Sequence, residues 1–341
     1  MTDQSMMVQL SPVLSVENLN VSFESARGIF QILEGVEFSL YPNEILALVG
    51  ETGCGKSVTA KSMLDLIPQL SRRRTGRVFF NESDLLTLSN RELRQVRGRS
   101  ISMIFQNPQS SINPVFTLGE QIFRLIRMYL KDEIDRLRKQ QNLKEKAAVR
   151  RIAKERLAEV GLTETDRLLK SHAHEISGGM AQRYKIALAL LGSPAVLIAD
   201  EATSALDVTV QAHILKLLKE MSQKKGTAIL FITHDLGIAA QICDRVAVMY
   251  SGRIVEVGPT LDIFQNPLHP YTRGLLRAIP KLGEDEKLVP ITGMIPDLAY
   301  PPTGCRFHPR CDRHMDECCR ERPSYCSVTR NHTVACYLYS L

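Results

Sequence analysis

The first residues that could do chemistry form a glycine-rich loop between an apolar run and a helical segment. Residues 50–57 read GETGCGKS, which fits the pattern G-x-x-x-x-G-K-[ST] of a phosphate-binding loop. Its glycines let the main chain turn tightly, so that backbone N–H groups and the N-terminus of the next helix point at phosphate oxygens. We expect Lys56 to reach the β- and γ-phosphates and the Ser57 hydroxyl to bind Mg²⁺. The rest of the predicted cradle is Gly50, Glu51, Thr52, Gly53, Cys54 and Gly55.

A pair of acidic residues closes a second informative segment. Residues 195–201 read AVLIADE, an apolar run that ends on Asp200 and Glu201. At the end of a strand, Asp200 can hold the coordination shell of Mg²⁺ and Glu201 can polarise an attacking water. In the same chain as a phosphate-binding loop, this pair predicts hydrolysis of a nucleoside triphosphate.

Cysteines are concentrated near the C-terminal end, where six of the eight fall within residues 305–336. Disulfides would suit a small secreted protein, but the N-terminal residues MTDQSMMVQL lack the basic and apolar pattern of a signal peptide. Metal binding is therefore the better interpretation of these cysteines. The alternative is a set of reduced, buried thiols without a ligand.

The segments that must position these groups have the patterns of an α/β protein. Two alternating segments predict an opening antiparallel β layer, and short apolar runs further along predict buried parallel strands. A charged, proline-free stretch over 118–159 predicts a helical insertion, after which strands and helices alternate as in a parallel sheet covered by helices. The predicted strands lie at 13–23, 35–40, 45–49, 196–199 and 228–233, and a predicted helix at 208–224.

The length of 341 residues exceeds what one hydrophobic core usually organises, so we expect a principal domain and a smaller appendage. Proline, histidine, arginine and cysteine accumulate after about residue 258, which predicts a principal domain at 1–258 and a C-terminal domain at 259–341. The longest apolar stretch, 186–199, is interrupted by Gly192 and Pro194 and is too short to span a bilayer. A membrane role would therefore come through partners.

Further motifs carry a family resemblance. Residues 176–190, ISGGMAQRYKIALAL, resemble the signature motif of ABC ATPases. Gln106 in IFQNPQ resembles the Q-loop of that family, residues 204–207 (SALD) its D-loop, and His234 in ITHD its switch histidine. The resemblance covers about the first 250 residues. It implies an α/β fold with a RecA-like core, an antiparallel β layer and a helical subdomain at about 107–190.

The resemblance also implies how the nucleotide is enclosed. In ABC ATPases two subunits pair head to tail, and the signature motif of one subunit closes the ATP that lies on the phosphate-binding loop of the other. Ser177 would cap a helix whose exposed N–H groups can bind the γ-phosphate across that interface. The residues that the resemblance places at this closing surface are Ser177, Gly178, Gly179 and Asp207.

Three further roles follow from the same resemblance. Gln106 would help to hold Mg²⁺ and water, and His234 would contact the γ-phosphate. The aromatic side chain that stacks on adenine is expected to be Phe30, with Phe23 as the alternative.

The C-terminal region carries a second, narrower resemblance. Residues 269–276, HPYTRGLL, and 296–311, PDLAYPPTGCRFHPRC, resemble the C-terminal extension of the oligopeptide and dipeptide importer ATPases. The cysteine spacing alone matches neither ferredoxins nor zinc fingers, so zinc is the alternative metal, and His308 and His314 could complete a mixed site. In that subfamily four cysteines bind a [4Fe–4S] cluster, and the matching positions are Cys305, Cys311, Cys318 and Cys336.

Together these features predict the ATP-hydrolysing subunit of a bacterial importer of di- or oligopeptides. The resemblance implies three kinds of partner: a second ABC ATPase subunit, expected to be a paralogue, two transmembrane permease subunits and an extracytoplasmic substrate-binding protein. The chain would lie peripherally at the cytoplasmic face of the inner membrane. Import of nickel or another small solute is the alternative within the family. A soluble ABC ATPase acting on nucleic acid or ribosomes fits less well, because the chain has one cassette, no sustained heptads and no nucleic-acid recognition motif.

Overall fold

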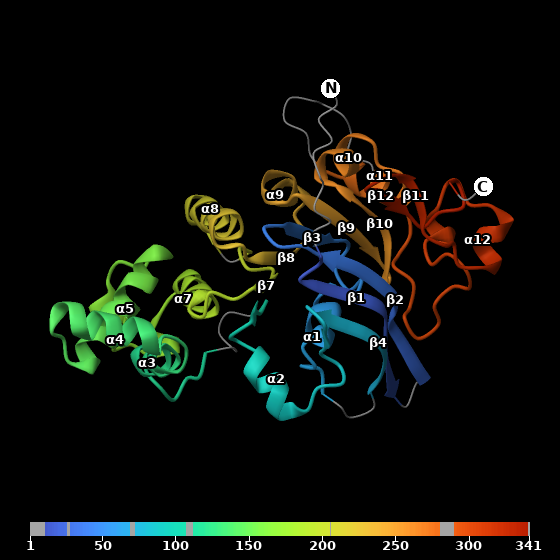
Figure 1. Ribbon diagram of the computed structural model, residues 1–341. Coiled ribbons are helices and arrows are strands. Elements are labelled where there is room, and N and C mark those ends of the chain that lie inside the picture. Colours follow the sequence, from blue (N-terminus) through green and yellow to red (C-terminus); the bar gives the residue numbers. More distant parts are fainter. Residues whose placement is uncertain are drawn as a thin grey trace, which may run out of the picture.

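Two β-sheets and an outlying group of helices form the molecule (Figure 1). A computed structural model describes residues 11–25, 28–68, 72–106, 112–204, 206–279 and 290–339. The N-terminal residues that we interpreted as lacking a signal peptide lie outside this described part. Within it, no helix has both the length and the apolar character needed to cross a membrane.

The smaller sheet is antiparallel and has the strand order β2-β1-β4-β5. In its register Leu14 faces Leu40 on one side and Phe80 on the other. The predicted antiparallel layer is thus confirmed, although the second strand begins earlier than the alternation at 35–40 suggested. The strands are β1 (Leu14–Ser25), β2 (Gly28–Leu40), β4 (Arg72–Phe80) and β5 (Ser83–Asp84).

The larger sheet has the order β11-β12-β10-β9-β3-β8-β7-β6. Its strands β6, β7, β8, β3 and β9 run parallel, and β10, β12 and β11 continue it in antiparallel fashion. The parallel part was predicted from the apolar runs. The strands are β3 (Ile45–Val49), β6 (Ile101–Ile104), β7 (Val196–Asp200), β8 (Ala228–Thr233), β9 (Arg245–Tyr250), β10 (Arg253–Pro259), β11 (Cys326–Thr329) and β12 (His332–Val334).

The core lies on both faces of this sheet, because alternate residues of a strand point to opposite sides. In β3, Ile45 and Val49 pack toward the helical side, whereas Leu46 and Leu48 pack toward the antiparallel sheet. All five residues of the strand are buried, which explains why it reads as a continuous apolar run. The helices of this part are α1 (Lys56–Met63), α2 (Asn90–Val96), α8 (Val208–Lys225), α9 (Leu236–Ile242), α10 (Thr260–Gln265) and α11 (Pro270–Arg277).

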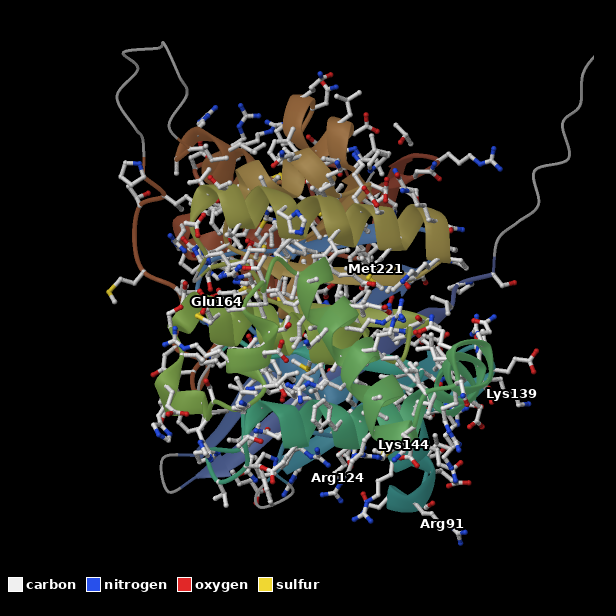
Figure 2. All side chains as sticks on the ribbon, turned by 90° about the vertical axis from the view of Figure 1, so that its left-hand side faces the viewer. Arg91, Arg124, Lys139, Lys144, Glu164 and Met221 are labelled. Atoms are coloured by element: carbon white, nitrogen blue, oxygen red, sulfur yellow. The ribbon has the colours of Figure 1, made fainter. Side chains whose placement is uncertain are left out.

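The helical subdomain projects to one side of the sheets (Figure 1). Thr117 starts its first helix with a capping box to Glu120, and the Tyr184 hydroxyl ties its last helix to the first by donating to Leu118 O at 2.6 Å. Figure 2 looks onto this subdomain and shows Arg124 and Lys144 toward its lower edge. The helices are α3 (Leu118–Tyr129), α4 (Lys131–Gln141), α5 (Glu145–Glu159), α6 (Thr165–Leu168) and α7 (Gly178–Leu190).

The C-terminal extension lies against the far end of the large sheet (Figure 1). It contains a short 3₁₀ turn at His308–Arg310 and α12 (Asp316–Arg320), followed by β11 and β12. Strand β12 pairs with β10, with Val334 opposite Glu256, so the large sheet runs across the predicted boundary at residues 258 and 259. The boundary itself stays a prediction.

Candidate functional site

The phosphate-binding loop connects β3 to α1. Gly50 has φ 153° and Gly55 has φ 111°, which are backbone conformations that favour glycine. A Cβ atom on Gly50 would lie 2.1 Å from Met249 O, so no other residue fits there without moving the chain. The helix begins at Lys56, within the GETGCGKS motif itself. Its N-terminus therefore opens directly onto the loop.

Lys56 lies folded over this loop. Its Nζ donates to Gly50 O at 2.7 Å and to Glu51 O at 3.0 Å, and the residue is 7% exposed. Cys54 is buried, and burial raises the pKa of its thiol, so it packs inside the loop as an uncharged group. The lysine ammonium is thus held within the loop, against the main chain at which phosphates would bind.

Ser57 and Asp200 meet at the junction of α1 and β7. The Ser57 hydroxyl donates to Asp200 Oδ1 at 3.0 Å. Asp200 Oδ2 is buried and has no hydrogen-bond partner among the described residues, and burial raises the pKa of this carboxyl group. An unpaired buried carboxylate oxygen beside a hydroxyl fits a hard divalent cation that prefers oxygen ligands. The donor set therefore suits Mg²⁺.

Glu201 brings the three predicted catalytic residues together. Its Oε2 accepts from Gln106 Nε2 at 2.9 Å, and its Oε1 lies 3.0 Å from His234 Nδ1. Burial opposes ionisation of Glu201, but the hydrogen bonds from His234 and Gln106 outweigh it and lower the pKa. Glu201 has φ 48°, a conformation uncommon for a residue with a side chain. The Glu201 carboxylate thus lies beside Ser57 and Asp200, the two residues whose oxygen atoms suit Mg²⁺.

The signature residues start a different helix. Ser177 is the N-cap of α7 and accepts from Met180 N–H at 3.3 Å, and Gly178 and Gly179 form the first turn. Asp207 caps α8 in the same way. No hydrogen bond or ion pair within the described ranges joins these residues to the phosphate-binding loop of their own chain, and α7 and α1 lie apart in Figure 1. Ala205 of the predicted D-loop lies outside the described residues.

The two candidate adenine aromatics are neighbours. Phe23 and Phe30 lie directly opposite each other in the β1–β2 pair, where side chains on one face come into contact distance. They therefore form one part of the surface. Which of the two side chains stacks on adenine stays a prediction.

One small pocket is lined by the four cysteines that the resemblance indicated, Cys305, Cys311, Cys318 and Cys336, whereas Cys319 is exposed outside it. Burial, together with a smaller effect of the neighbouring cysteines, raises the pKa of Cys305 to about 11. Backbone N–H groups of Arg313 and Met315 donate to the sulfurs of Cys311 and Cys318 at 3.4 and 3.5 Å. The donor chemistry fits a thiolate-bound metal centre. As the side chains stand, however, no three potential ligands in the described part of the chain are grouped to hold a metal ion, so the predicted centre is not confirmed.

Two residues at the phosphate-binding loop were not predicted from the sequence. The Tyr271 hydroxyl accepts from Glu51 N–H at 2.9 Å, and Arg310 pairs with the Glu51 carboxylate. Tyr271 belongs to the HPYTRGLL segment and Arg310 to the cysteine-rich one. The resemblance of both segments to a known extension was the signal available, but it did not indicate a contact with the loop.

Two family models match the chain. The model described as ABC transporter matches residues 33–204, and the model described as oligopeptide/dipeptide transporter, C-terminal region, matches residues 255–318.

Individual proteins match over almost the whole chain. A dipeptide transport ATP-binding protein, DppD of Bacillus subtilis (strain 168), is 46% identical over 96% of this chain and 95% of its own. An oligopeptide transport ATP-binding protein of the same organism, AppD, is 42% identical over 97% and 98%. Among solved structures, that of a dimeric bacterial ABC transporter cassette, MJ0796, has a TM-score of 0.62 and 25% identity, covering 72% of this chain and 98% of that one.

Proposed function

The chain belongs to the ABC transporter family, and we propose that it is the ATP-hydrolysing subunit of a bacterial importer of di- or oligopeptides. The main support for ATPase function is that Gln106 and His234 both contact the Glu201 carboxylate, next to a phosphate-binding loop. The peptide substrate is supported by the C-terminal region, whose family model is that of oligopeptide and dipeptide transporters.

The phosphate-binding loop holds the nucleotide. Its backbone N–H groups and the N-terminus of α1 bind phosphate oxygens, and Lys56 exchanges its carbonyl partners for the β- and γ-phosphates. Ser57, Asp200 and Gln106 are the residues that would hold Mg²⁺, which when bound neutralises charge on those oxygens. The adenine lies toward the aromatic pair of β1 and β2, on Phe30.

Glu201 orients the water that attacks the γ-phosphate. Its lowered pKa keeps it ionised and able to accept a hydrogen bond from that water. Gln106 fixes the carboxylate from one side, and His234 turns from Glu201 to the γ-phosphate when nucleotide is bound. Hydrolysis therefore needs all three side chains in one place.

A second ABC ATPase subunit, expected to be a paralogue, completes each nucleotide site. Its signature residues meet the phosphates on this chain, and this chain offers Ser177, Gly178, Gly179 and Asp207 in return. The N-cap geometry of Ser177 supports this, because its hydroxyl accepts from Met180 N–H at the N-terminus of α7, and a helix N-terminus attracts phosphate.

One of the two permease subunits docks beside the Q-loop of this chain. A groove of about 180 Å³ lies between β6 and the helices α3 and α7, and Leu125, Tyr129 and Leu188 give it an apolar lining. Phe105, the neighbour of Gln106, also lines the groove, so an occupant there would be felt at the catalytic carboxylate. The chain would then lie at the cytoplasmic face of the membrane, and an extracytoplasmic binding protein would deliver the peptide.

The four pocket cysteines form the proposed metal centre, a [4Fe–4S] cluster with zinc as the alternative. Uncompensated thiolates would repel one another in this pocket, and a cationic centre removes that penalty. Iron, sulfide and zinc analysis of anaerobically purified protein tests this, together with the visible absorption of iron–sulfur clusters. Cys336→Ser should lose the metal, and the matched Cys319→Ser should keep it. Protein without metal in the unmodified form would refute the proposal.

ATPase activity in membranes tests the function as a whole. The chain should hydrolyse ATP faster when it is assembled with its neighbouring permease and ATPase subunits, and Glu201→Gln should abolish that rate. A chain that is fully active alone and indifferent to membrane partners would instead be a soluble ABC ATPase.

A further inference from the structure

An ion pair joins the C-terminal extension to the phosphate-binding loop. Arg310 Nη1 and Nη2 donate to the two carboxylate oxygens of Glu51 at 2.8 and 3.1 Å. This two-bond geometry is the strong form of an arginine–carboxylate pair, and the Arg310 side chain is only 5% exposed. Glu51 is the second residue of GETGCGKS. An extension 259 residues away in the sequence thus supplies a partner for the nucleotide site.

The main chain of Glu51 is held from the same side. Its N–H donates to the buried Tyr271 hydroxyl, and its carbonyl accepts from Lys56 Nζ. Tyr271 packs in turn on Tyr250 and on Phe307, with ring centroids 4.6 and 5.4 Å away. The position of Glu51, which is a partner of Lys56, therefore depends on an aromatic cluster to which the extension contributes Tyr271 and Phe307.

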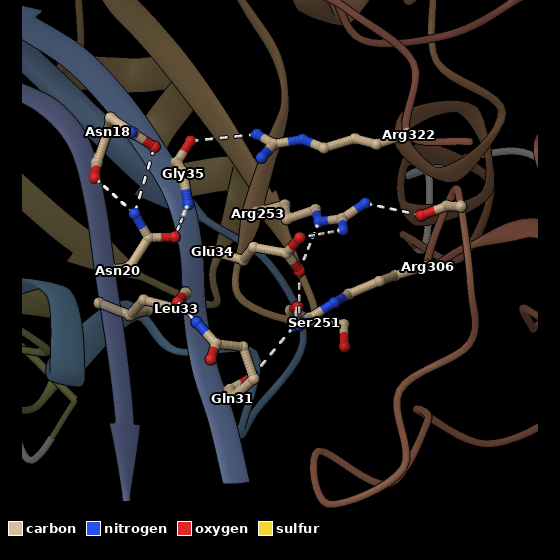
Figure 3. A network of polar contacts seen from close by, with 11 residues as sticks. Asn18, Asn20, Gln31, Leu33, Glu34, Gly35, Ser251, Arg253, Arg306 and Arg322 are labelled. Carbon is tan, nitrogen blue, oxygen red and sulfur yellow. Dashed lines mark hydrogen bonds and ion pairs between the residues drawn. The ribbon is translucent and has the colours of Figure 1, made fainter. Parts of the chain in front are cut away.

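Residues 305–311, here called the clamp loop, are also fixed at their other end. Arg306 lies at 2.7 Å from Glu34 in β2 and donates to Ser251 O and Gln31 O, at 2.5 and 3.3 Å. Figure 3 shows this side chain crossing from the extension to the strand, beside Arg253, which pairs with the same Glu34. The clamp loop is thus attached to the nucleotide-binding part both at β2 and at the phosphate-binding loop.

The contact between Arg310 and Glu51 changes the charge at the phosphate-binding loop. A carboxylate in a loop that binds phosphates repels the nucleotide, and the repulsion is strong where water is partly excluded. The guanidinium of Arg310 offsets that charge and also fixes the residue whose carbonyl holds Lys56.

We propose that Arg310 is a positioning residue of the ATP site, which neutralises Glu51 and keeps the phosphate-binding loop ready for nucleotide. The inference rests on the proposed function, since it takes this loop to be where ATP binds. By linkage, if the clamp loop strengthens ATP binding, then ATP must stabilise the clamp loop by the same factor.

The experiment is a titration of the full-length chain with MgATP. Arg310→Ala should raise the Kd about tenfold, while the matched exposed variant Arg320→Ala should leave it unchanged. Removing the repelling charge as well, in Glu51→Gln with Arg310→Ala, should restore affinity to within about threefold of the unmodified chain. In the assembled transporter Arg310→Ala should raise KM and leave kcat nearly unchanged. If Arg310→Ala does not fold, Arg310→Gln carries the same expectation.

Hydrogen exchange supplies the reciprocal readout. MgATP should slow exchange in residues 305–311 of the unmodified chain and should do so about tenfold less in Arg310→Ala. A Kd for Arg310→Ala equal to that for Arg320→Ala, or a double variant no better than Arg310→Ala alone, would overturn the inference. Failure of the unmodified chain to bind ATP would instead refute the proposed function.

Discussion

Glu256 is the residue on which we expect the attachment of the C-terminal extension to depend most. Its side chain is fully buried in β10, and its carboxylate accepts from Leu268 N–H at 2.8 Å and His269 N–H at 2.9 Å. The same carboxylate lies 2.7 Å from His332 Nε2, at the start of β12. One acceptor therefore joins β10, the beginning of α11 and β12.

Glu256→Ala removes this acceptor and leaves three donors without a partner, of which those of His269 and His332 are buried and that of Leu268 is partly buried. Each unpaired buried donor costs about 1–3 kcal/mol, and water that enters the vacated space recovers part of the sum. We therefore expect the free energy of unfolding to fall by about 3–5 kcal/mol. Glu256→Gln retains an acceptor oxygen and should lose only about 1–2 kcal/mol. Glu220→Ala, on the exposed face of α8, is the control and should change nothing measurable.

Urea unfolding followed by far-UV circular dichroism measures these differences as shifts in the midpoint. Limited proteolysis locates them, because the first cuts in Glu256→Ala should fall near β12, where the sheet loses its outer pair of strands. The reasoning would be refuted by a midpoint for Glu256→Ala equal to that for Glu220→Ala. First cuts in the helical subdomain would refute it as well.

The nucleotide site and the pocket permit further tests. Asp200→Asn should abolish the gain in ATP affinity that Mg²⁺ provides, as titrations with and without EDTA would show. Ser177→Ala should lower the ATPase rate of the assembled transporter about tenfold, since it removes the cap at the closing surface, and should leave the Kd of the isolated chain unchanged. Cys336→Ser should lower the melting temperature of the metal-loaded protein and Cys319→Ser should not, in parallel calorimetric scans. Burial lowers the pKa of His269 to about 3, so below its ordinary value of about 6.5 the unfolded chain binds a proton that the folded chain excludes. Stability should therefore fall with decreasing pH below about 6.5, by at most about 1.4 kcal/mol per unit, and His269→Gln should flatten the pH dependence of the urea midpoint.

The parallel strands could be predicted because each is specified by its own residues. The run 45–49 was expected as a buried strand and is found as Ile45–Val49, with every residue buried. Strand β2 shows where this fails. Apart from the buried Leu33, its first half, Gly28 to Glu34, is exposed or half-buried, so no alternation marks it, and it is extended because it pairs with β1.

The site was predictable in its parts for a related reason. Gln106, Glu201 and His234 follow three neighbouring parallel strands, β6, β7 and β8, whose carboxyl ends lie at one edge of the sheet. Their individual roles were expected from the resemblance. Gln106 and His234 both contact Glu201, whose backbone is in the left-handed conformation. No residue type in AVLIADE predicts such a conformation.

The contact between Arg310 and Glu51 had no such local signal. From sequence patterns alone, a glutamate in a phosphate-binding loop is assigned to that loop, and an arginine among cysteines is assigned to the solvent-exposed surface. Such patterns compare only residues that are close together in the sequence. Their pairing depends on contacts between segments far apart in the sequence, because Arg306 binds Glu34 and Phe307 packs on Tyr271, and these contacts hold the clamp loop beside the phosphate-binding loop. Contacts made by the C-terminal extension thus bring a side chain to a site that the motifs already described. For this chain, ATP affinity should therefore depend on residues that no nucleotide-binding motif contains.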